Sequence, residues 1–457
     1  MLTRIYLIYC KALLCGGYTH SSYVFTDKVL HDIDSFDECS AYPYTLVTNK
    51  FPMGKFRKCN ITRREQMSTK FAYIIVVHFF DLKCKYLNHF ISGSKCYDIR
   101  GAKYDNGRIY ECKECKMVLT DVDFYFILDT HKCKYKIEEC YFAKYDYLPL
   151  QYINFVLDKY EAKTKYKDDE TKKLQYQKEK NKYNAIYGMT VTNTIRKNVE
   201  YFDDSGEWKE TDLTNDEIIL KLNEEKKKAF LSFSWGCWCT AFARDHLLRR
   251  VIELDDYVVY CDTDSCKLIQ GYNKSVFDRY NKEVENKIEK VSEILGIDKS
   301  RFIPKDIHGK EHMLGIFEYE GRYDEFITQG AKKYAVTKWK KNSKIKKDDN
   351  VIKKGAEESK VLEITVAGVP KTGSKCLKNL SEFKDDLVFD YEYTNKNTLF
   401  YCENQEEFDL TDYQGNTYHV TDKTACCLVP TTYVLGKALE YAELIEDESS
   451  SRAFYKE

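Results

Sequence analysis

The sequence contains no long hydrophobic run. Hydrophobic residues make up 43% of the 457 residues, but no stretch approaches the roughly 20 apolar residues that a membrane-spanning helix needs. The apolar start, Leu2 to Leu14, is interrupted by Arg4 and Lys11 and has no clear signal-peptide cleavage site. We therefore expect this segment to be an internal strand, and we expect no membrane partner.

Common nucleotide-binding signatures are also missing. The sequence has no P-loop, no internal repeat and no glycine pattern of the dinucleotide-binding type. Net charge is almost absent, because 72 Lys and Arg residues balance 73 Asp and Glu residues. This balance hides a basic segment, Lys338 to Lys354, in which eight lysines accompany two aspartates. The segment is either a solvated hairpin or a surface that follows nucleic-acid phosphates.

Cysteine is abundant, but only one pair has a tight metal-binding spacing. The chain has 18 cysteines, several of them in apolar runs, so we expect free buried thiols. Cys112 and Cys115 form the one CxxC sequence, whereas a zinc ribbon needs two such pairs. Zinc remains the alternative, with these further cysteines as candidate ligands: Cys84, Cys96, Cys133 and Cys140.

Two aspartates separated by one residue are the most informative feature. Asp262-Thr263-Asp264 lies between apolar residues, which predicts a hairpin over 257–268 with the acidic pair at its tip. Alternate residues of a strand share a face, so the carboxylates would repel each other and the pKa of at least one would rise. A cation that prefers oxygen ligands, Mg²⁺ or Mn²⁺, would relieve this repulsion. The alternative is a solvated turn, because Asp, Thr and Ser are common turn residues.

Strands and helices are dispersed along the chain rather than alternating, which predicts an α+β fold. Strands are expected at 33–37, 71–80, 315–319, 326–336 and 361–366, with short strands and turns over 84–118 and a hairpin over 199–209. Helices are expected directly after residue 37, over 152–187 with a polar break at 165–171, and over 217–250.

Other polar residues have spacings that suit phosphoryl chemistry. Asp37 ends a predicted strand, so it would complete a two-metal site with the hairpin tip or cap the following helix, and both roles can coexist. Lys180, Asn184, Tyr187 and Gly188 have the spacing of one helix face, although Lys180 alone is also a common surface residue. Arg244 suits either a phosphate contact or a structural salt bridge.

The order of these motifs resembles that of family B DNA polymerases. The chain shows Asp-x2-Ser-x-Tyr-Pro, Lys-x3-Asn-x2-Tyr-Gly, Thr-x2-Ala-Arg, Tyr-x-Asp-Thr-Asp-Ser and Lys-x-Tyr, beginning at residues 37, 180, 240, 260 and 332. The protein-primed branch of small tailed phages and linear plasmids is the most similar. The likeness runs from about Gly16 to past Gly368.

The resemblance implies roles for individual residues. Asp37 and Asp264 would hold two Mg²⁺ or Mn²⁺ ions, and Asp262 would assist as a third catalytic residue. The incoming dNTP would contact Tyr42, which would exclude a 2′-hydroxyl group, as well as Lys180, Asn184 and Tyr187. Primer-template DNA would contact a wider set of residues: Ser40, Gly188, Thr240, Arg244, Lys332 and Tyr334.

The resemblance also implies a right-hand polymerase fold, with an antiparallel palm sheet, helical fingers, a small thumb and two insertions. The palm would comprise residues 1–60 and 231–365, the fingers 151–188, and the thumb and C-terminal tail 366–457. The first insertion, 61–150, would contact the priming protein and DNA. The second, a hairpin within 189–230, would assist strand displacement.

The chain departs from the family pattern at three places. Ala185 stands where the family usually has Ser, and Leu14-Cys15-Gly16-Gly17 lacks the Tyr that normally begins its linker motif. Family members also carry a proofreading exonuclease domain before the polymerase, and the 36 residues before Asp37 are too few for one. We therefore expect either a separately encoded exonuclease as a partner or a truncated reading frame.

The function implied is template-directed addition of dNTPs to DNA in viral or mobile-element replication, primed by a terminal protein. The expected location is the cytoplasm, that of the host cell if the chain is viral. One alternative is a non-catalytic DNA-binding remnant of a truncated polymerase gene. Another is a reverse transcriptase, although that family favours adjacent aspartates and Thr263 separates them here.

Overall fold

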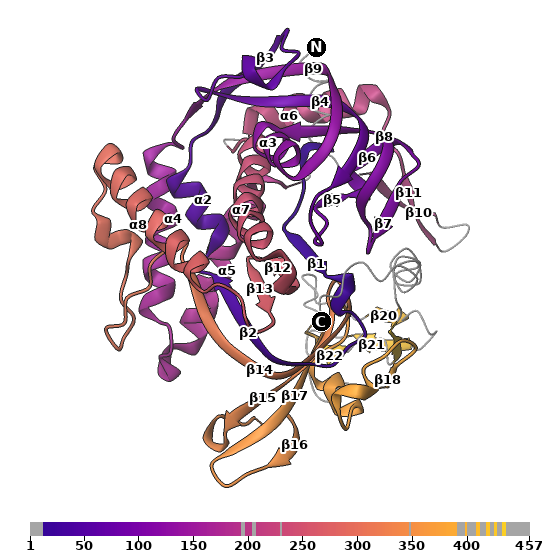
Figure 1. Cartoon of the computed structure of the whole chain (residues 1–457), viewed down its shortest axis with the longest axis vertical. Helices are drawn as coiled ribbons and strands as arrows, with labels where there is room; N and C mark the ends of the chain where they lie inside the picture. Colours follow the sequence, from indigo (N-terminus) through magenta and orange to yellow (C-terminus); the bar gives the residue numbers. More distant parts are fainter. Residues whose placement is uncertain are drawn as a thin grey trace. The chain divides into compact units, whose positions relative to one another are not determined.

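The structure is a computed structural model of the whole chain (Figure 1). It describes residues 12–192, 197–202, 207–228, 231–346 and 349–390, and the short segments 398–399, 408–411, 417–420, 425–426 and 432–435. These residues divide into two compact units, one of 12–24 and 34–321, the other of 25–33 and the described residues from 322 onward. The division falls within β2 (Leu30–Glu38) and β14 (Phe317–Gly330), so each unit contains part of both strands.

An antiparallel sheet supports the centre of the first unit. Its strand order is β1 (Tyr18–Ser21), β12 (Val258–Thr263), β13 (Ser265–Leu268), the end of β2 and the start of β14. β12 and β13 form the hairpin predicted over 257–268. The first four residues of β12 and all of β13 are buried, so side chains on both faces of the hairpin are covered.

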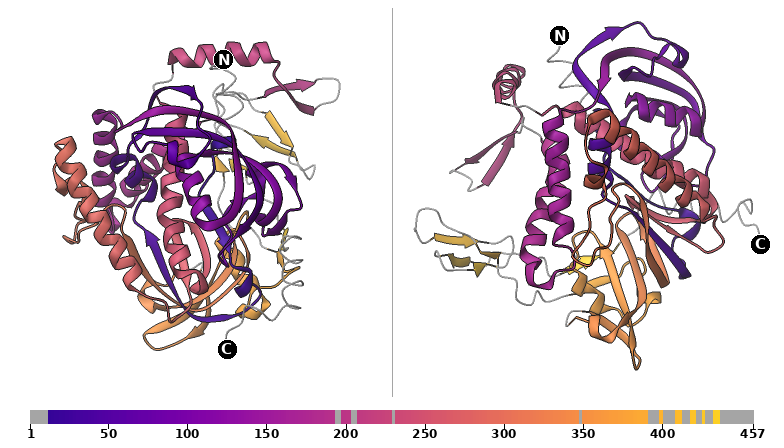
Figure 2. Two further views of the ribbon diagram at one scale, coloured as in Figure 1. Left: turned by 45° about the horizontal axis from the view of Figure 1, so that its top comes forward. Right: turned by 90° about the vertical axis from the view of Figure 1, so that its left-hand side faces the viewer.

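The first unit also contains several helices. They are α2 (Ala41–Thr48), α4 (Leu150–Lys165), α5 (Lys173–Thr190), α6 (Asn215–Lys228), α7 (Phe233–Leu254) and α8 (Ser275–Leu295). α4 and α5 lie side by side (Figure 2) and confirm the helices predicted over 152–187. The helical stretch predicted over 217–250 is confirmed by two helices, because α6 ends at Lys228 and α7 begins at Phe233.

A seven-stranded antiparallel sheet forms a second layer of the first unit. Its strands are β3 (Phe51–Cys59), β9 (His131–Asp146), β4 (Phe71–Cys84), β8 (Arg108–Thr120) and β5 (Ile91–Ser92), with β6 (Cys96–Arg100) and β7 (Lys103–Asp105) also paired to β8. α3 (Asp121–Thr130) packs on this sheet, and the apolar residues between them form a core of their own. The sheet spans most of the predicted first insertion.

The predicted hairpin over 199–209 is confirmed by the pairing of β10 (Asn198–Phe202) with β11 (Glu207–Thr211). The turn predicted at its tip, 203–206, lies outside the described residues. The start of the chain differs from expectation, because residues 12 and 13 are helical rather than extended. Residues 1–11 lie outside the described ranges.

The second unit contains the remaining strands of the sheet that begins with β1, which has eight strands in all, and has its own core. β15 (Lys333–Lys341) pairs with β14 on one side and with β17 (Glu358–Val366) on the other, and β16 (Asn350–Lys354) pairs with β17. Shorter strands follow: β18 (Val388–Asp390), β19 (Thr398–Leu399), β20 (Phe408–Thr411), β21 (Thr417–Val420), β22 (Ala425–Cys426) and β23 (Thr432–Val434). The basic segment lies on β15 and β16, where Lys338 and Lys340 pair with Glu363.

The cysteines whose side chains the structure describes are free thiols, as expected, and Cys112 and Cys115 are both buried. None of the helices in the described part of the chain combines the length and apolar character needed to cross a membrane.

Candidate active site

A tight turn at the tip of the β12–β13 hairpin brings Asp264 next to the end of β2. Thr263 has a left-handed backbone conformation with φ of 63°, and the Asp264 N–H donates to the Asp262 carbonyl oxygen over 2.7 Å. The Asp264 carbonyl oxygen accepts from the Glu38 N–H, also over 2.7 Å, and Asp37 lies opposite Ser265 in the strand register. The hairpin predicted with the acidic pair at its tip is confirmed, but the turn at Thr263 interrupts the alternation that was expected to place both carboxylates on one face.

The turn is held by residues at the start of β1. A Cβ atom on Gly17 would lie 2.7 Å from the Thr263 methyl carbon, so only glycine fits beside the turn. The hydroxyl groups of Thr19 and Thr263 both donate to Asp262 Oδ1, each over 3.1 Å. Asp262 is thus tied to β1 and to its own turn, whereas Asp264 lies next to β2.

Asp37 belongs to β2 and not to the cap of the following helix. The residue before α2 is Ser40, whose left-handed backbone (φ 61°) turns the chain into the helix. Asp37 is instead held in register opposite Ser265. This position favours the metal-site interpretation of Asp37 over the helix-cap alternative.

Asp37, Asp264 and Glu38 lie close together at the hairpin tip, and their negative charges repel one another. Burial, together with the charge of Asp264, raises the pKa of Asp37 well above its usual value. Burial also raises the pKa of Asp264, with further contributions from the charges of Glu38 and Asp262. The neighbouring Glu38 is fully buried, and this burial raises its pKa to about 8. The cluster therefore favours either protons or an added cation.

Sequence reasoning missed a buried lysine beside these carboxylates. Lys267 lies opposite Ser35 in the sheet and donates from Nζ to Ser35 Oγ over 2.7 Å. Ser35 Oγ donates to Glu320 over 2.9 Å, and Glu320 lies 3.7 Å from Lys267 Nζ. The charge of Lys267 lowers the pKa of Asp37 and offsets part of the repulsion. The sequence signal was a lysine inside an apolar strand, Cys266-Lys267-Leu268.

Two of the residues predicted to bind the nucleotide are brought together. The rings of Tyr42 on α2 and Tyr187 on α5 have centroids 4.5 Å apart. Burial raises the pKa of Tyr42 to about 12, with smaller contributions from Asp264 and Asp262. Asn184 is exposed on α5, and so is Gly188, which was predicted to contact DNA.

Two lysines project from the α4–α5 pair. Lys180 is half-buried, with Nζ 5.8 Å from the centroid of the Tyr176 ring. Lys163, which the sequence motifs did not reveal, donates to Ser40 Oγ over 3.1 Å. Burial lowers the pKa of Lys163, the charge of Lys180 lowers it further, and the charge of Asp37 raises it. Lys163 therefore lies within electrostatic reach of both the carboxylates and Lys180.

Arg244 and Thr240, predicted to contact DNA, lie in the protein interior. Arg244 donates from Nη2 to Asp123 over 2.8 Å, and from Nη1 to the carbonyl oxygens of Gly16, over 2.8 Å, and of Cys15. Thr240 donates to the carbonyl oxygen of Cys237 within α7, over 3.0 Å. The structural salt bridge was the alternative that the sequence left open for Arg244.

Lys332 and Tyr334 belong to the second unit. Lys332 has φ of 58° at the turn between β14 and β15, and the Tyr334 ring stacks on Phe326 with centroids 5.3 Å apart. Their contact with DNA stays a prediction.

Comparison with known proteins shows the family. Residues 3–267 match the family described as "DNA polymerase type B, organellar and viral". The chain belongs to this family of type B DNA polymerases. Among curated proteins there is no match.

Solved structures of Phi29 DNA polymerase share the fold of this type B polymerase chain. The complex with primer-template DNA has a TM-score of 0.59 at 15% identity, covering 95% of this chain and 62% of that chain. The complex with primer-template DNA and incoming nucleotides has a TM-score of 0.58 at 15% identity, covering 93% and 62%. The α+β right-hand polymerase fold expected from the sequence is confirmed. The chain spans less than two thirds of the length of these structures.

Proposed function

We propose that this chain is a DNA-directed DNA polymerase that adds dNTPs to the 3′-hydroxyl of a primer. The observation that carries the proposal is the meeting of Asp37, on β2, with Asp264, at the tip of the β12–β13 hairpin, with a raised pKa for both carboxylates. A protein keeps such like charges together where an added cation offsets their repulsion.

The donor set at the hairpin tip suits two Mg²⁺ or Mn²⁺ ions. Carboxylate oxygens are the ligands that these ions prefer. Asp37 and Asp264 would hold the ions, and Asp262 would assist from its place beside Thr19. When bound, the ions would stabilise charge on the attacking and leaving oxygens of an in-line phosphoryl transfer.

The neighbouring side chains suit the rest of the nucleotide. Lys180, joined by Lys163, would neutralise the triphosphate. Tyr42 would pack under the sugar and exclude a 2′-hydroxyl group, and Tyr187 with Asn184 would line the nascent base pair. The contact between the Tyr42 and Tyr187 rings supports this arrangement.

DNA would be bound by Ser40, Gly188, Lys332 and Tyr334. Arg244 would act indirectly, because its hydrogen bonds hold the backbone of Cys15 and Gly16 next to the glycine that supports the Thr263 turn. Thr240, which bonds within α7, would also act indirectly. The domain boundaries and the two insertions expected from the sequence belong to this proposal. So do the terminal protein and the separate exonuclease as partners.

The test is primer extension with Mg²⁺ by the wild-type chain and by Asp264→Asn and Asp37→Asn. Each variant is expected to lose at least about 100-fold in rate, the effect of removing one group that stabilises transition-state charge. Asp256→Asn, an exposed aspartate close to the same hairpin, is the matched control and is expected to keep its rate. Near-normal extension by Asp264→Asn would contradict the proposal.

Two further results would separate the alternatives. A wild-type chain that binds primer-template DNA with a steep salt dependence, yet incorporates no dNTP, would instead identify a non-catalytic remnant. Protein priming is tested by incubating the chain with labelled dNTP and the candidate terminal protein. Absence of label on that protein, under conditions where DNA-primed extension works, would exclude it.

A further inference from the structure

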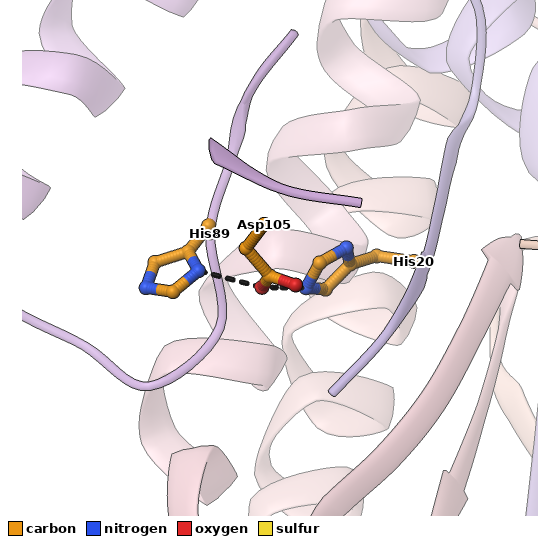
Figure 3. A group of neighbouring side chains, drawn as sticks. All are labelled: His20, His89 and Asp105. Carbon is orange, nitrogen blue, oxygen red and sulfur yellow. Dashed lines mark hydrogen bonds and ion pairs between the residues drawn. The ribbon is translucent and has the colours of Figure 1, made fainter. Parts of the chain in front are cut away.

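A cluster of metal-binding side chains lies apart from the carboxylates of the candidate active site. His20 on β1, His89 before β5 and Asp105 at the end of β7 each offer one ligand atom, and these atoms lie within 4.8 Å of one another (Figure 3). Their exposed fractions are 1%, 6% and 0%. Within the described ranges, no other group of three His, Cys, Asp or Glu residues has this spacing.

Local structure fixes each of these side chains. His20 lies opposite Cys261 in the β1–β12 pairing. Asp105 lies opposite Arg108, across a turn at residues 106 and 107 that both have positive φ, the conformation of a tight two-residue hairpin. The His89 ring stacks on the rings of Tyr23 and Tyr110, with centroids 5.9 and 5.1 Å away. The three ligands are therefore positioned by packing before any ion binds.

Hydrogen bonds within the protein leave part of this cluster unsatisfied. Asp105 Oδ2 lies 2.6 Å from His89 Nδ1 and 3.0 Å from His20 Nε2, the second contact being an ion pair when His20 is protonated. Among the residues that the structure describes, none forms a hydrogen bond with Asp105 Oδ1 or with His20 Nδ1, whereas His20 Nε2 faces Asp105 Oδ2 in the 3.0 Å contact. Buried polar atoms are normally paired, so these atoms call for an additional partner.

We propose that His20, His89 and Asp105 form a structural site for one divalent transition-metal ion, with Zn²⁺ as the best fit. Two imidazole nitrogens and one Asp105 oxygen provide three ligand atoms of the kinds that Zn²⁺ binds, and the second Asp105 oxygen or a water molecule would complete four-coordination. Mixed nitrogen and oxygen ligands also disfavour Mg²⁺, which prefers oxygen alone. Coordination through His89 Nδ1 requires that its ring proton sits on Nε2, so the bond to the metal replaces the hydrogen bond to Asp105.

Such a site would tie the two sheets of the first unit together. His20 follows Thr19, which holds Asp262, whereas Asp105 belongs to the strands paired with β8. The metal would fix the position of β1, and with it the support of the Thr263 turn. It would bind whether or not the chain polymerises DNA, because none of its ligands belongs to the carboxylate site.

Metal content of the purified full chain tests the site. The chain is stripped with a chelator, loaded with Zn²⁺ and dialysed, and zinc is counted per chain by elemental analysis. All variants also carry Asp264→Asn, so that zinc bound at the carboxylate site adds equally little to the count for each variant. His20→Ala, His89→Gln and Asp105→Asn are each expected to lose one tightly bound zinc. The exposed-histidine variants His31→Ala and His308→Ala, and Cys112→Ser in the CxxC pair, are expected to keep it.

X-ray absorption of the zinc-loaded chain identifies the ligands without a variant in the cluster. Nitrogen and oxygen neighbours at about 2.0–2.1 Å, with no sulfur at about 2.3 Å, are expected. Sulfur ligation would assign the zinc to cysteines and overturn the proposal. A wild-type cluster that binds no zinc would also overturn it, and would leave His20, His89 and Asp105 as a metal-free hydrogen-bond network. If a variant fails to fold, the absorption spectrum of the unaltered cluster decides.

Discussion

Arg244 and the Asp37–Asp264 pair are both charged motif groups of the first unit, but their surroundings differ. Asp123 and two backbone carbonyl groups face Arg244. Burial lowers the pKa of Arg244, but the charge and hydrogen bonds of Asp123, together with the charges of Cys15 and Tyr42, outweigh burial and raise this pKa, which favours the charged form. Asp37 and Asp264 face other carboxylates, and their raised pKa disfavours the charged form. A buried charge with protein partners supports the fold, whereas a buried charge among like charges is suited to a cation from outside.

The largest effect is expected from removing Arg244, the residue of this comparison whose charge has partners within the protein. Arg244→Met would leave the Asp123 carboxylate largely buried without its partner, so we expect a loss of about 3–5 kcal/mol in the free energy of unfolding. Arg249→Met is the matched control on the same helix, where the more exposed Arg249 pairs with Asp245, and should lose at most about 1 kcal/mol. Chemical denaturation measures both. Equal losses would show that Arg244 is not a structural support.

A smaller, kinetic effect is expected from the lysine beside the carboxylates. Lys163→Met should raise KM for dNTP about 10- to 100-fold. This factor corresponds to the free energy of one hydrogen bond to a charged group. The reason is that Lys163 lies near both Asp37 and Lys180. Lys165→Met, an exposed lysine of the same helix, should leave KM unchanged. Steady-state primer extension distinguishes them, and an unchanged KM in Lys163→Met would remove this residue from the triphosphate site.

The support of the hairpin tip is tested by Gly17→Ala. The added methyl group would press against the Thr263 side chain, so stability should fall by about 1–3 kcal/mol and extension should slow. Adding Thr263→Ser removes the methyl carbon nearest to the new Cβ and should recover part of the loss. No recovery in the double variant would mean that the contact with Thr263 is not the cause.

Glu38 provides a prediction of a different kind, a difference in pH dependence. An acid whose pKa is higher in the folded state stabilises that state below its unfolded pKa, and loses this contribution as the pH rises through the folded value. For Glu38 the window runs from about pH 4.3 to about pH 8. In metal-free buffer, Glu38→Gln should therefore be more stable than wild type at pH 8, by about 1 kcal/mol or more, and similar at pH 4. Parallel pH profiles would contradict the raised pKa.

Local patterns predicted much of the fold and part of the site. The hairpin over 257–268, the strand ending near Asp37 and the helix row from Lys180 to Gly188 each depend on residues close together in sequence. The interior position of Arg244 could not be predicted, because its partner Asp123 lies 121 residues away. Lys163 meets Ser40 across 123 residues, and Lys267 meets Ser35 across 232. Long-range pairing decides which of several plausible motif residues faces a ligand.

The most direct test of the carboxylate site is the free energy of unfolding of wild type and Asp264→Asn at pH 8, measured with chelator and with Mn²⁺. With chelator, Asp264→Asn should be at least as stable as wild type, because a repelling charge is removed. With Mn²⁺ at about 100 times its dissociation constant, wild type should gain about 2.7 kcal/mol and the variant much less. The His20–His89–Asp105 cluster is intact in both chains, so Mn²⁺ bound there would stabilise both equally and would not change the difference between them. An equal gain in both chains would contradict the assignment of Asp264 as a metal ligand.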